Sequence, residues 1–221
     1  MPVQGSLPLV LFIVSDLTEG RNGSYAAQLL HRLDRDRFRL AVVSLELPGP
    51  ASERIQRVGA PVYQLDVPHD ARRLRPWWCF VGLAQLQSYV RQLRPQLVHT
   101  LGFQANLWGR IAARMGRVPR VLSTFRNPAR RASVETLMSR LTAGTADLNV
   151  AFGESMAATC RERWNIHPRR IVTLDPEIKT EEMLNRHESI YASLLVGCQG
   201  DSRKSGLARE SRNPGGTQEE G

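Results

Sequence analysis

Short apolar runs that alternate with helix-length segments constrain the fold of this 221-residue chain more than any other feature. The runs are rich in Val, Leu, Ile and Phe and are bounded by turn-forming residues, as is typical of buried strands. Parallel neighbours in a sheet need a crossover of a dozen or more residues, usually a helix. The alternation therefore predicts a mostly parallel sheet with helices on both faces. The predicted strands cover residues 7–15, 38–45, 61–65, 96–100, 120–124, 147–152 and 170–174.

Helical spacing of apolar side chains marks two of the intervening segments. In residues 24–32 the apolar positions recur at helical intervals after Ser24, which is a candidate N-cap. Residues 103–115 carry a second such face, and Gly116 follows as a natural helix end. We therefore expect residues 1–175 to form one α/β domain with a Rossmann-like, doubly wound sheet.

The character of the chain changes after residue 175. Residues 176–195 have scattered apolar positions and are expected to form a helix that packs back on the domain. Residues 196–221 contain six glycines and only four hydrophobic residues, too little apolar surface to offset the entropy of ordering a chain. The sequence therefore predicts a disordered C-terminal tail over residues 196–221.

The composition indicates neither a membrane-spanning nor a disulfide-bonded protein. The longest apolar stretch, residues 76–90, is flanked by arginines and falls short of the ~18 apolar residues of a spanning helix. The N-terminal apolar run follows no basic residue and lacks a small-residue cleavage site, so we interpret it as a strand rather than a signal peptide. Cys79, Cys160 and Cys198 are odd in number and lack ligand spacing, which predicts a cytoplasmic protein with no metal and no cofactor.

The formal net charge is +9, and the basic excess lies in residues 1–175, where every Lys or Arg position is Arg. A basic domain favours an anionic partner such as a nucleoside diphosphate, a lipid phosphate or a nucleic acid. A GC-rich genome that favours Arg codons explains the same excess. The sequence has no evident recognition-helix motif, so we do not expect a nucleic-acid partner.

A basic cluster stands next to two tryptophans ahead of a helical apolar face. This combination is typical of peripheral docking on an anionic membrane surface, here at the inner face of the membrane. A core-packing helix with a basic, solvated start explains the same pattern and is favoured by composition alone. The residues concerned are Arg72, Arg73, Arg75, Trp77 and Trp78.

Glycines precede the first predicted helix. Gly20, Asn22, Gly23 and Ser24 lie in the connection after the first strand, where glycine lets backbone N–H groups and a helix N-terminus approach a phosphate. These four are therefore candidate substrate-binding residues. The spacing matches neither GxGxxG nor the GK[ST] of a P-loop, so an NAD-binding Rossmann protein is a lesser alternative.

Further candidates follow the fourth and fifth strands, at the edge where ligands of open α/β sheets collect. His99 ends the fourth strand and is the candidate catalytic residue, although spacing alone favours a half-buried strand histidine bonded to a neighbouring loop. Phe103 and Asn106 open the next helix, and Arg126 follows the fifth strand. A guanidinium at that position is suited to hold a phosphate or sugar acid, or to cap a helix C-terminus. No hydrolase constellation can be assembled.

The ordered segments from residue 8 to residue 175 resemble the N-terminal domain of family 4-like glycosyltransferases, which have the GT-B fold. The resemblance is carried by segments such as LTEGRNGSYAAQLLHRL, LRPQLVHTLGFQANLWGRIAARMG and ADLNVAFGESMAATC. It implies an enzyme that transfers a sugar from a nucleotide-diphosphate sugar to a glycan, lipid or small acceptor. In such enzymes this domain binds mainly the acceptor, its first loop faces the donor diphosphate, and a second domain holds most of the nucleotide sugar.

The chain departs from the family pattern at three places. The family often has Gly-Gly-Ala-Glu where residues 22–25 are Asn-Gly-Ser-Tyr, and His-Thr-His where residues 99–101 are His-Thr-Leu. The Pro-Asn-Gly of the interdomain linker is replaced by Asp-Pro-Glu at residues 175–177, and the residues after it are too few for a second domain. We therefore expect an acceptor-side half that is inactive alone and needs a donor-domain partner chain. The alternative is a non-catalytic binding module or a truncated pseudoenzyme subunit.

Overall fold

The structure is a computed structural model that describes residues 7–17, 21–46, 49–65, 77–126 and 133–210. Within these ranges, only the backbone is described for residues 21, 77–79, 133–136 and 197–210. Gly20 and the basic residues Arg72, Arg73 and Arg75 lie outside the described residues.

A seven-stranded parallel sheet forms the centre of the molecule, with strand order β3-β2-β1-β4-β5-β6-β7. Each of the predicted apolar runs overlaps one of these strands to within one residue at its C-terminal end, so the prediction of a doubly wound α/β sheet is confirmed. The strands are β1 (Leu9–Val14), β2 (Arg39–Ser44), β3 (Val62–Gln64), β4 (Leu97–Leu101), β5 (Arg120–Phe125), β6 (Leu148–Phe152) and β7 (Ile171–Leu174).

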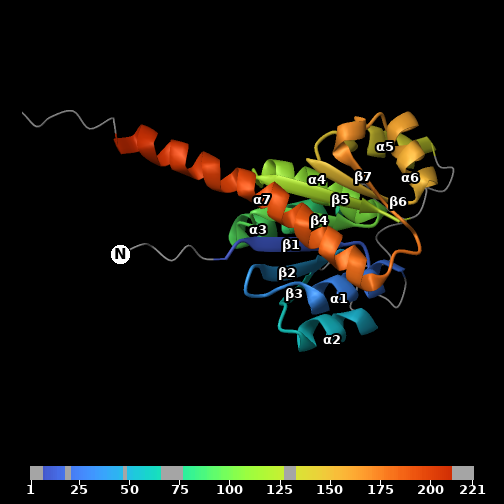
Figure 1. Cartoon of the computed structure of the whole chain (residues 1–221), viewed down its shortest axis with the longest axis horizontal. Helices are drawn as coiled ribbons and strands as arrows, with labels where there is room; N and C mark the ends of the chain where they lie inside the picture. The colour runs from blue at the N-terminus through green and yellow to red at the C-terminus, as the bar shows by residue number, and fades with distance from the viewer. Residues whose placement is uncertain (1–6, 18–20, 47–48, 66–76, 127–132, 211–221) are drawn as a thin grey trace, which may run out of the picture.

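Helices cover both faces of the sheet (Figure 1). Because successive strand side chains point to opposite faces, Val10, Phe12 and Val14 of β1 pack in one core cluster, together with side chains of α1, α2 and α7. Leu11 and Ile13 pack in a second cluster with α3 and α4. The helices are α1 (Arg21–Arg32), α2 (Pro50–Arg57), α3 (Trp77–Leu93), α4 (Phe103–Met115), α5 (Ser133–Ala143), α6 (Glu154–Glu162) and α7 (Thr180–Glu210), with a short 3-10 helix at Pro168–Arg170.

Helix α1 begins earlier than the sequence predicted. It starts at Arg21, so Ser24 lies inside its first turns and is not the N-cap. Gly23 is also helical and buried. The early start follows from tertiary packing, which overrides the low helix propensity of Asn, Gly and Ser in this turn.

Helix α7 crosses one face of the sheet, with Tyr191 fully buried (Figure 1). Its side chains belong to the core cluster as far as Leu195, and Val196 is 71% exposed. The helical backbone continues to Glu210, where the side chains are not among those described. The division of the C-terminal segment at residue 196 stays a prediction. Residues 211–221 lie outside the described residues.

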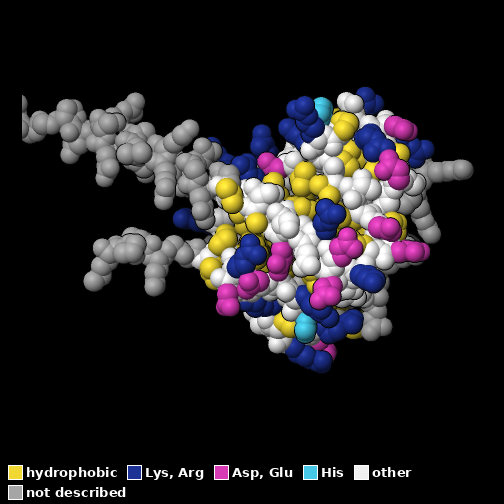
Figure 2. All heavy atoms as spheres, viewed as in Figure 1, with side chains coloured by type: hydrophobic (Ala, Val, Ile, Leu, Met, Phe, Trp, Pro, Cys, Tyr) yellow, Lys and Arg dark blue, Asp and Glu magenta, His cyan; other side chains and the backbone are white. Residues whose placement is uncertain are grey.

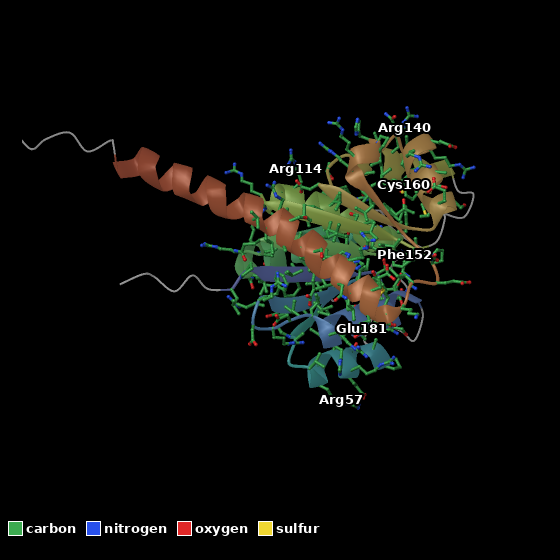
Figure 3. The ribbon with its side chains drawn as sticks, viewed as in Figure 1. Arg57, Arg114, Arg140, Phe152, Cys160 and Glu181 are labelled. Atoms are coloured by element: carbon green, nitrogen blue, oxygen red, sulfur yellow. The ribbon has the colours of Figure 1, made fainter. Side chains whose placement is uncertain are left out.

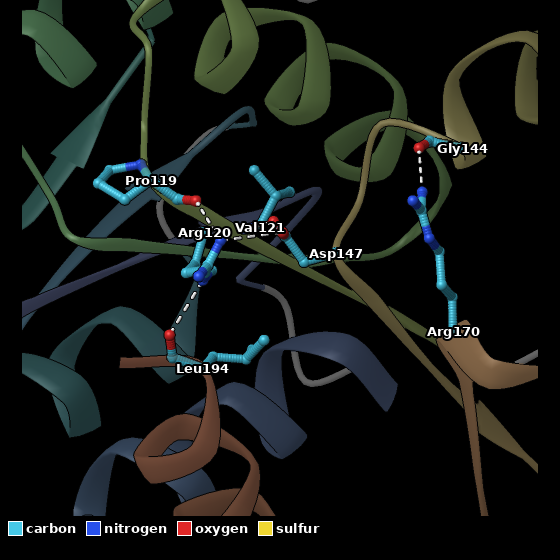
Figure 4. Close-up of polar contacts among 7 residues, drawn as sticks. All are labelled: Pro119, Arg120, Val121, Gly144, Asp147, Arg170 and Leu194. Carbon is cyan, nitrogen blue, oxygen red and sulfur yellow. Dashed lines mark hydrogen bonds and ion pairs between the residues drawn. The ribbon is translucent and has the colours of Figure 1, made fainter. Parts of the chain in front are cut away.

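Polar contacts fix the middle and the end of the packed part of α7. The Arg120 guanidinium at the start of β5 donates through Nε to the Leu194 carbonyl at 3.0 Å and pairs with Asp147 at 3.5 Å (Figure 4). Glu188 accepts from the Asp34 backbone N–H at 3.3 Å and lies 3.6 Å from Arg37. The helix is therefore held against the sheet and against the α1–β2 connection.

Among the described residues, no helix is both long and apolar enough to cross a membrane. Trp77 and Trp78 open α3, and their side chains are not among those described. Docking of this segment on a membrane surface therefore stays a prediction.

Candidate functional site

The carboxyl ends of all seven strands meet at one edge of the sheet, and the chain changes direction between β1 and β4. After β1 it continues to β2 on one side, and after β3 it returns to place β4 on the other side. Open α/β sheets bind their ligands in the crevice at such a switch point. The connections that follow β1 and β4 are therefore the first place to look for a site.

Ser15, just after β1, joins these two connections. Its backbone N–H donates to the Leu101 carbonyl at 3.0 Å, and its Oγ accepts from the Ala105 backbone N–H at 3.1 Å. Gly102 is the N-cap of α4 and has no side chain that could accept a hydrogen bond from the first turn of the helix. Ser15 accepts one instead, from an N–H group that has no partner within the helix. The first turn of α4 is thereby fixed against the end of β1.

Gly102 allows the close approach of the two connections. Its φ is +96°, and a Cβ built on it would lie 2.6 Å from the Ser15 Oγ and 2.8 Å from the Asn22 Nδ2. Any larger residue would strain the backbone and clash. Asn22 is thus held beside the start of α4, where Phe103 is half-buried. The structure brings together two candidate residues that are far apart in sequence.

Arg126 lies at the same edge, directly after β5. Its Cζ lies 4.6 Å from the ring centroid of Tyr25 and 5.2 Å from that of Phe152. Phe152, which Figure 3 labels, is the last residue of β6. Aromatic faces attract a guanidinium and orient it. Burial raises the pKa of Tyr25, so this ring stays neutral at physiological pH. Side chains of α1 and β6 therefore position the cation that the sequence proposed for phosphate or sugar-acid binding.

The candidate catalytic residue His99 is buried beneath α7. Its side chain is 0% exposed, with Nδ1 2.7 Å from the Tyr191 hydroxyl and Nε2 2.8 Å from the Thr124 Oγ1. Burial lowers the pKa of His99 well below its usual value, and the nearby His187 lowers it further. Both ring nitrogens therefore have partners on α7 and β5, whereas spacing alone had favoured a half-buried histidine bonded to a neighbouring loop. A catalytic role for His99 stays a prediction.

Asn106 is buried in a similar way. Its Oδ1 accepts from the Thr100 hydroxyl at 2.6 Å, and its Nδ2 donates to the Thr124 carbonyl at 3.0 Å. These bonds tie α4 to the carboxyl ends of β4 and β5. Asn106 therefore supports the edge of the sheet, and its role as a binding residue stays a prediction.

A buried arginine beneath this edge of the sheet is the feature that sequence reasoning missed. Arg110 on α4 is 1% exposed. Its Nε donates to the Ser123 Oγ at 2.8 Å, and its Nη2 donates to the Asn149 Oδ1 at 3.0 Å. Its guanidinium also lies 5.1 Å from the ring centroid of Phe125. Burial lowers the pKa of Arg110 to about 9. In the described part of the chain no carboxylate pairs with it. The sequence signal that could have indicated a buried arginine is the presence of two polar residues, Ser123 and Asn149, inside the apolar runs of β5 and β6.

Within the described ranges, no cluster of three or more His, Cys, Asp or Glu side chains could hold a metal ion. The candidate residues at the edge supply amide, hydroxyl and guanidinium groups instead. Such groups bind phosphates, carboxylates and sugar hydroxyls.

The model of Glycosyltransferase Family 4 matches residues 23–182, from the start of α1 into α7. This chain belongs to glycosyltransferase family 4. The match includes Arg126, Phe152 and the connection after β4 that forms the switch point. No curated protein matches the chain in sequence.

Solved structures of glycosyltransferases share the fold of this family 4 chain. HepE from Anabaena, in complex with UDP, is 14% identical with a TM-score of 0.59 over 77% of this chain and 44% of its own. MurG from Acinetobacter baumannii is 16% identical, with a TM-score of 0.57 over 78% of this chain and 46% of the MurG chain. A sucrose-phosphate synthase chain from Thermosynechococcus elongatus is 12% identical, with a TM-score of 0.60 over 84% of this chain and 99% of the synthase chain. The family 4 chain therefore spans about half the length of HepE and MurG, and its fold is that of one GT-B domain.

Proposed function

We propose that this chain supplies the acceptor-side half of an enzyme that transfers a sugar from a nucleotide-diphosphate sugar to a glycan, lipid or small acceptor. The observation that carries the proposal is the family 4 match over residues 23–182, because those residues build the carboxyl edge of the sheet. HepE binds UDP in one solved structure and UDP with glucose in another, which supports a nucleotide sugar as the donor. A cytoplasmic location stays a prediction.

The chemistry available at the edge fits binding and positioning. Arg126, held over Tyr25 and Phe152, offers a fixed cation to a phosphate or an acidic sugar. Asn22, beside Gly102, adds an amide near the start of α4. If the transfer retains the configuration of the sugar, it needs no nucleophilic side chain. Positioning and stabilisation of the leaving diphosphate then provide the catalysis.

The purified chain alone is expected not to transfer sugar at an appreciable rate. Only interactions gained in the transition state accelerate a reaction, and one fixed guanidinium contributes about 1.5–3 kcal/mol, well below the roughly 8 kcal/mol or more of an enzyme. The measurement is release of nucleoside diphosphate from UDP-glucose, UDP-N-acetylglucosamine and GDP-mannose with lipid and sugar acceptors. Robust turnover without a partner chain would overturn the half-enzyme proposal.

A further inference from the structure

A groove runs along α1 and α2 from Ser24, near the start of α1, to the last turns of the two helices. Its volume is about 660 Å³, and the first residue of α7 closes one side. On the face seen in Figure 2, Arg and Lys side chains lie over α1 and α2 together with acidic ones, and Figure 3 labels Arg57 on α2. The groove is lined by Ser24, Ala27, Gln28, His31, Arg32, Arg54, Arg57, Val58 and Thr180.

The charge of this α1–α2 groove is positive. Its lining includes Arg32, Arg54, Arg57 and His31 and no acidic side chain. Arg57 pairs with Glu53 at 3.3 Å, but both side chains are about three-quarters exposed, and such surface pairs contribute little. In the described part of the chain no carboxylate pairs with Arg32 or Arg54. An anion in the groove would therefore meet three guanidinium groups and at most one competing carboxylate.

Helix electrostatics explain only part of this arrangement. The four cationic or titratable side chains lie in the last turns of α1 and α2, where a positive charge interacts favourably with the helix C-terminus. That effect needs one cation per helix and does not require the cations to share a cavity. Two helices that end with their basic side chains lining the same groove create a site that neither helix has alone.

We propose that the α1–α2 groove binds a small phosphate-bearing ligand, such as a sugar phosphate or a diphosphate. Guanidinium groups recognise phosphate oxygens through paired hydrogen bonds, and Arg32, Arg54 and Arg57 surround the volume. Ala27 and Val58 add an apolar surface for the organic part of the ligand. The volume of about 660 Å³ is that of a small-molecule site. The proposal is independent of sugar transfer, because binding here needs no donor.

Isothermal titration calorimetry with inorganic pyrophosphate and with glucose 6-phosphate tests the groove. At least one of the two is expected to bind the wild-type chain, and the double variant Arg54→Gln/Arg57→Gln is expected to bind it at least about tenfold more weakly, because each charge-assisted hydrogen bond contributes about 1.5–3 kcal/mol. Whichever probe binds more tightly identifies a free diphosphate or a sugar phosphate as the preferred ligand. Both arginines are on the surface, and a circular dichroism melt checks that the variant folds.

The matched control is the double variant Arg163→Gln/Arg169→Gln, which removes the same charge from two exposed arginines outside the groove. It is expected to keep the wild-type affinity. Equal weakening by both double variants would mean that binding follows net charge alone, and the proposal would fail. Failure of both probes to bind more tightly than about 1 mM would also overturn it.

Discussion

Replacing Tyr191 with alanine is expected to lower the free energy of unfolding by about 3–5 kcal/mol. Tyr191 is fully buried, and its ring makes edge contacts with Phe12 at 6.4 Å and Phe38 at 6.0 Å. Its hydroxyl lies 2.7 Å from the Nδ1 of His99. The substitution therefore opens a cavity between α7 and the sheet and leaves a buried nitrogen without its partner. Urea denaturation followed by circular dichroism measures the loss.

Two further variants separate packing from hydrogen bonding. Tyr191→Phe keeps the ring and removes the bond to His99, so it is expected to cost about 1–3 kcal/mol. Val196→Ala shortens an apolar side chain on the same helix that is 71% exposed, and is expected to change stability by less than about 0.5 kcal/mol. A Tyr191→Ala chain as stable as the wild type would show that α7 does not pack on the sheet.

Lowering the pH from 7 to 5 is expected to destabilise the fold by about 2 kcal/mol through His187 alone. His187 donates through Nδ1 to the Met183 carbonyl at 2.8 Å, so its Nε2 accepts from the Tyr25 hydroxyl at 2.9 Å. Burial lowers the pKa of His187 to about 4. The unfolded chain takes up a proton near pH 6.5 and the folded chain does not. Stability is therefore complete above that pH and falls as the pH decreases toward 4.

His99 adds to this loss, because burial lowers its pKa in the same direction. The slope of unfolding free energy against pH approaches about 1.4 kcal/mol per pH unit for each buried histidine. His187→Gln is expected to reduce that slope between pH 7 and 5, whatever it does to the stability itself. A slope that does not change in His187→Gln would contradict the neutral, buried state of this imidazole.

The sheet was predictable because strands buried on both faces appear as continuous apolar runs. LVLFIV in β1 shows this most clearly, since all six residues are buried. The connections at Gly102 and Arg126 were also predictable as parts of one edge, because a parallel sheet collects its carboxyl ends there. The convergence of Asn22 with Gly102 is a consequence of that topology.

The environment of His99 was not predictable from its position in the chain. Its burial depends on Tyr191 and His187, which stand four residues apart on α7. Tyr191 was expected to pack on the domain, but the polar atoms of His187 hide its role as a core residue. Arg110 was missed for a related reason. A charged residue on a predicted helix is normally assigned to the solvent, whereas Ser123 and Asn149, from two strands, satisfy this guanidinium inside the fold.

Chemical-shift mapping of UDP binding tests the central claim most directly. The titration uses the ¹⁵N-labelled Arg54→Gln/Arg57→Gln chain, so that the α1–α2 groove does not take up the diphosphate. We predict shifts that concentrate at the carboxyl edge, at Asn22, Phe103 and Arg126, and that weaken in an added Arg126→Gln substitution. Shifts confined to the opposite edge, around Arg94 and Arg117, or no shifts at all, would contradict the assignment of this edge as the substrate site of a family 4 glycosyltransferase domain.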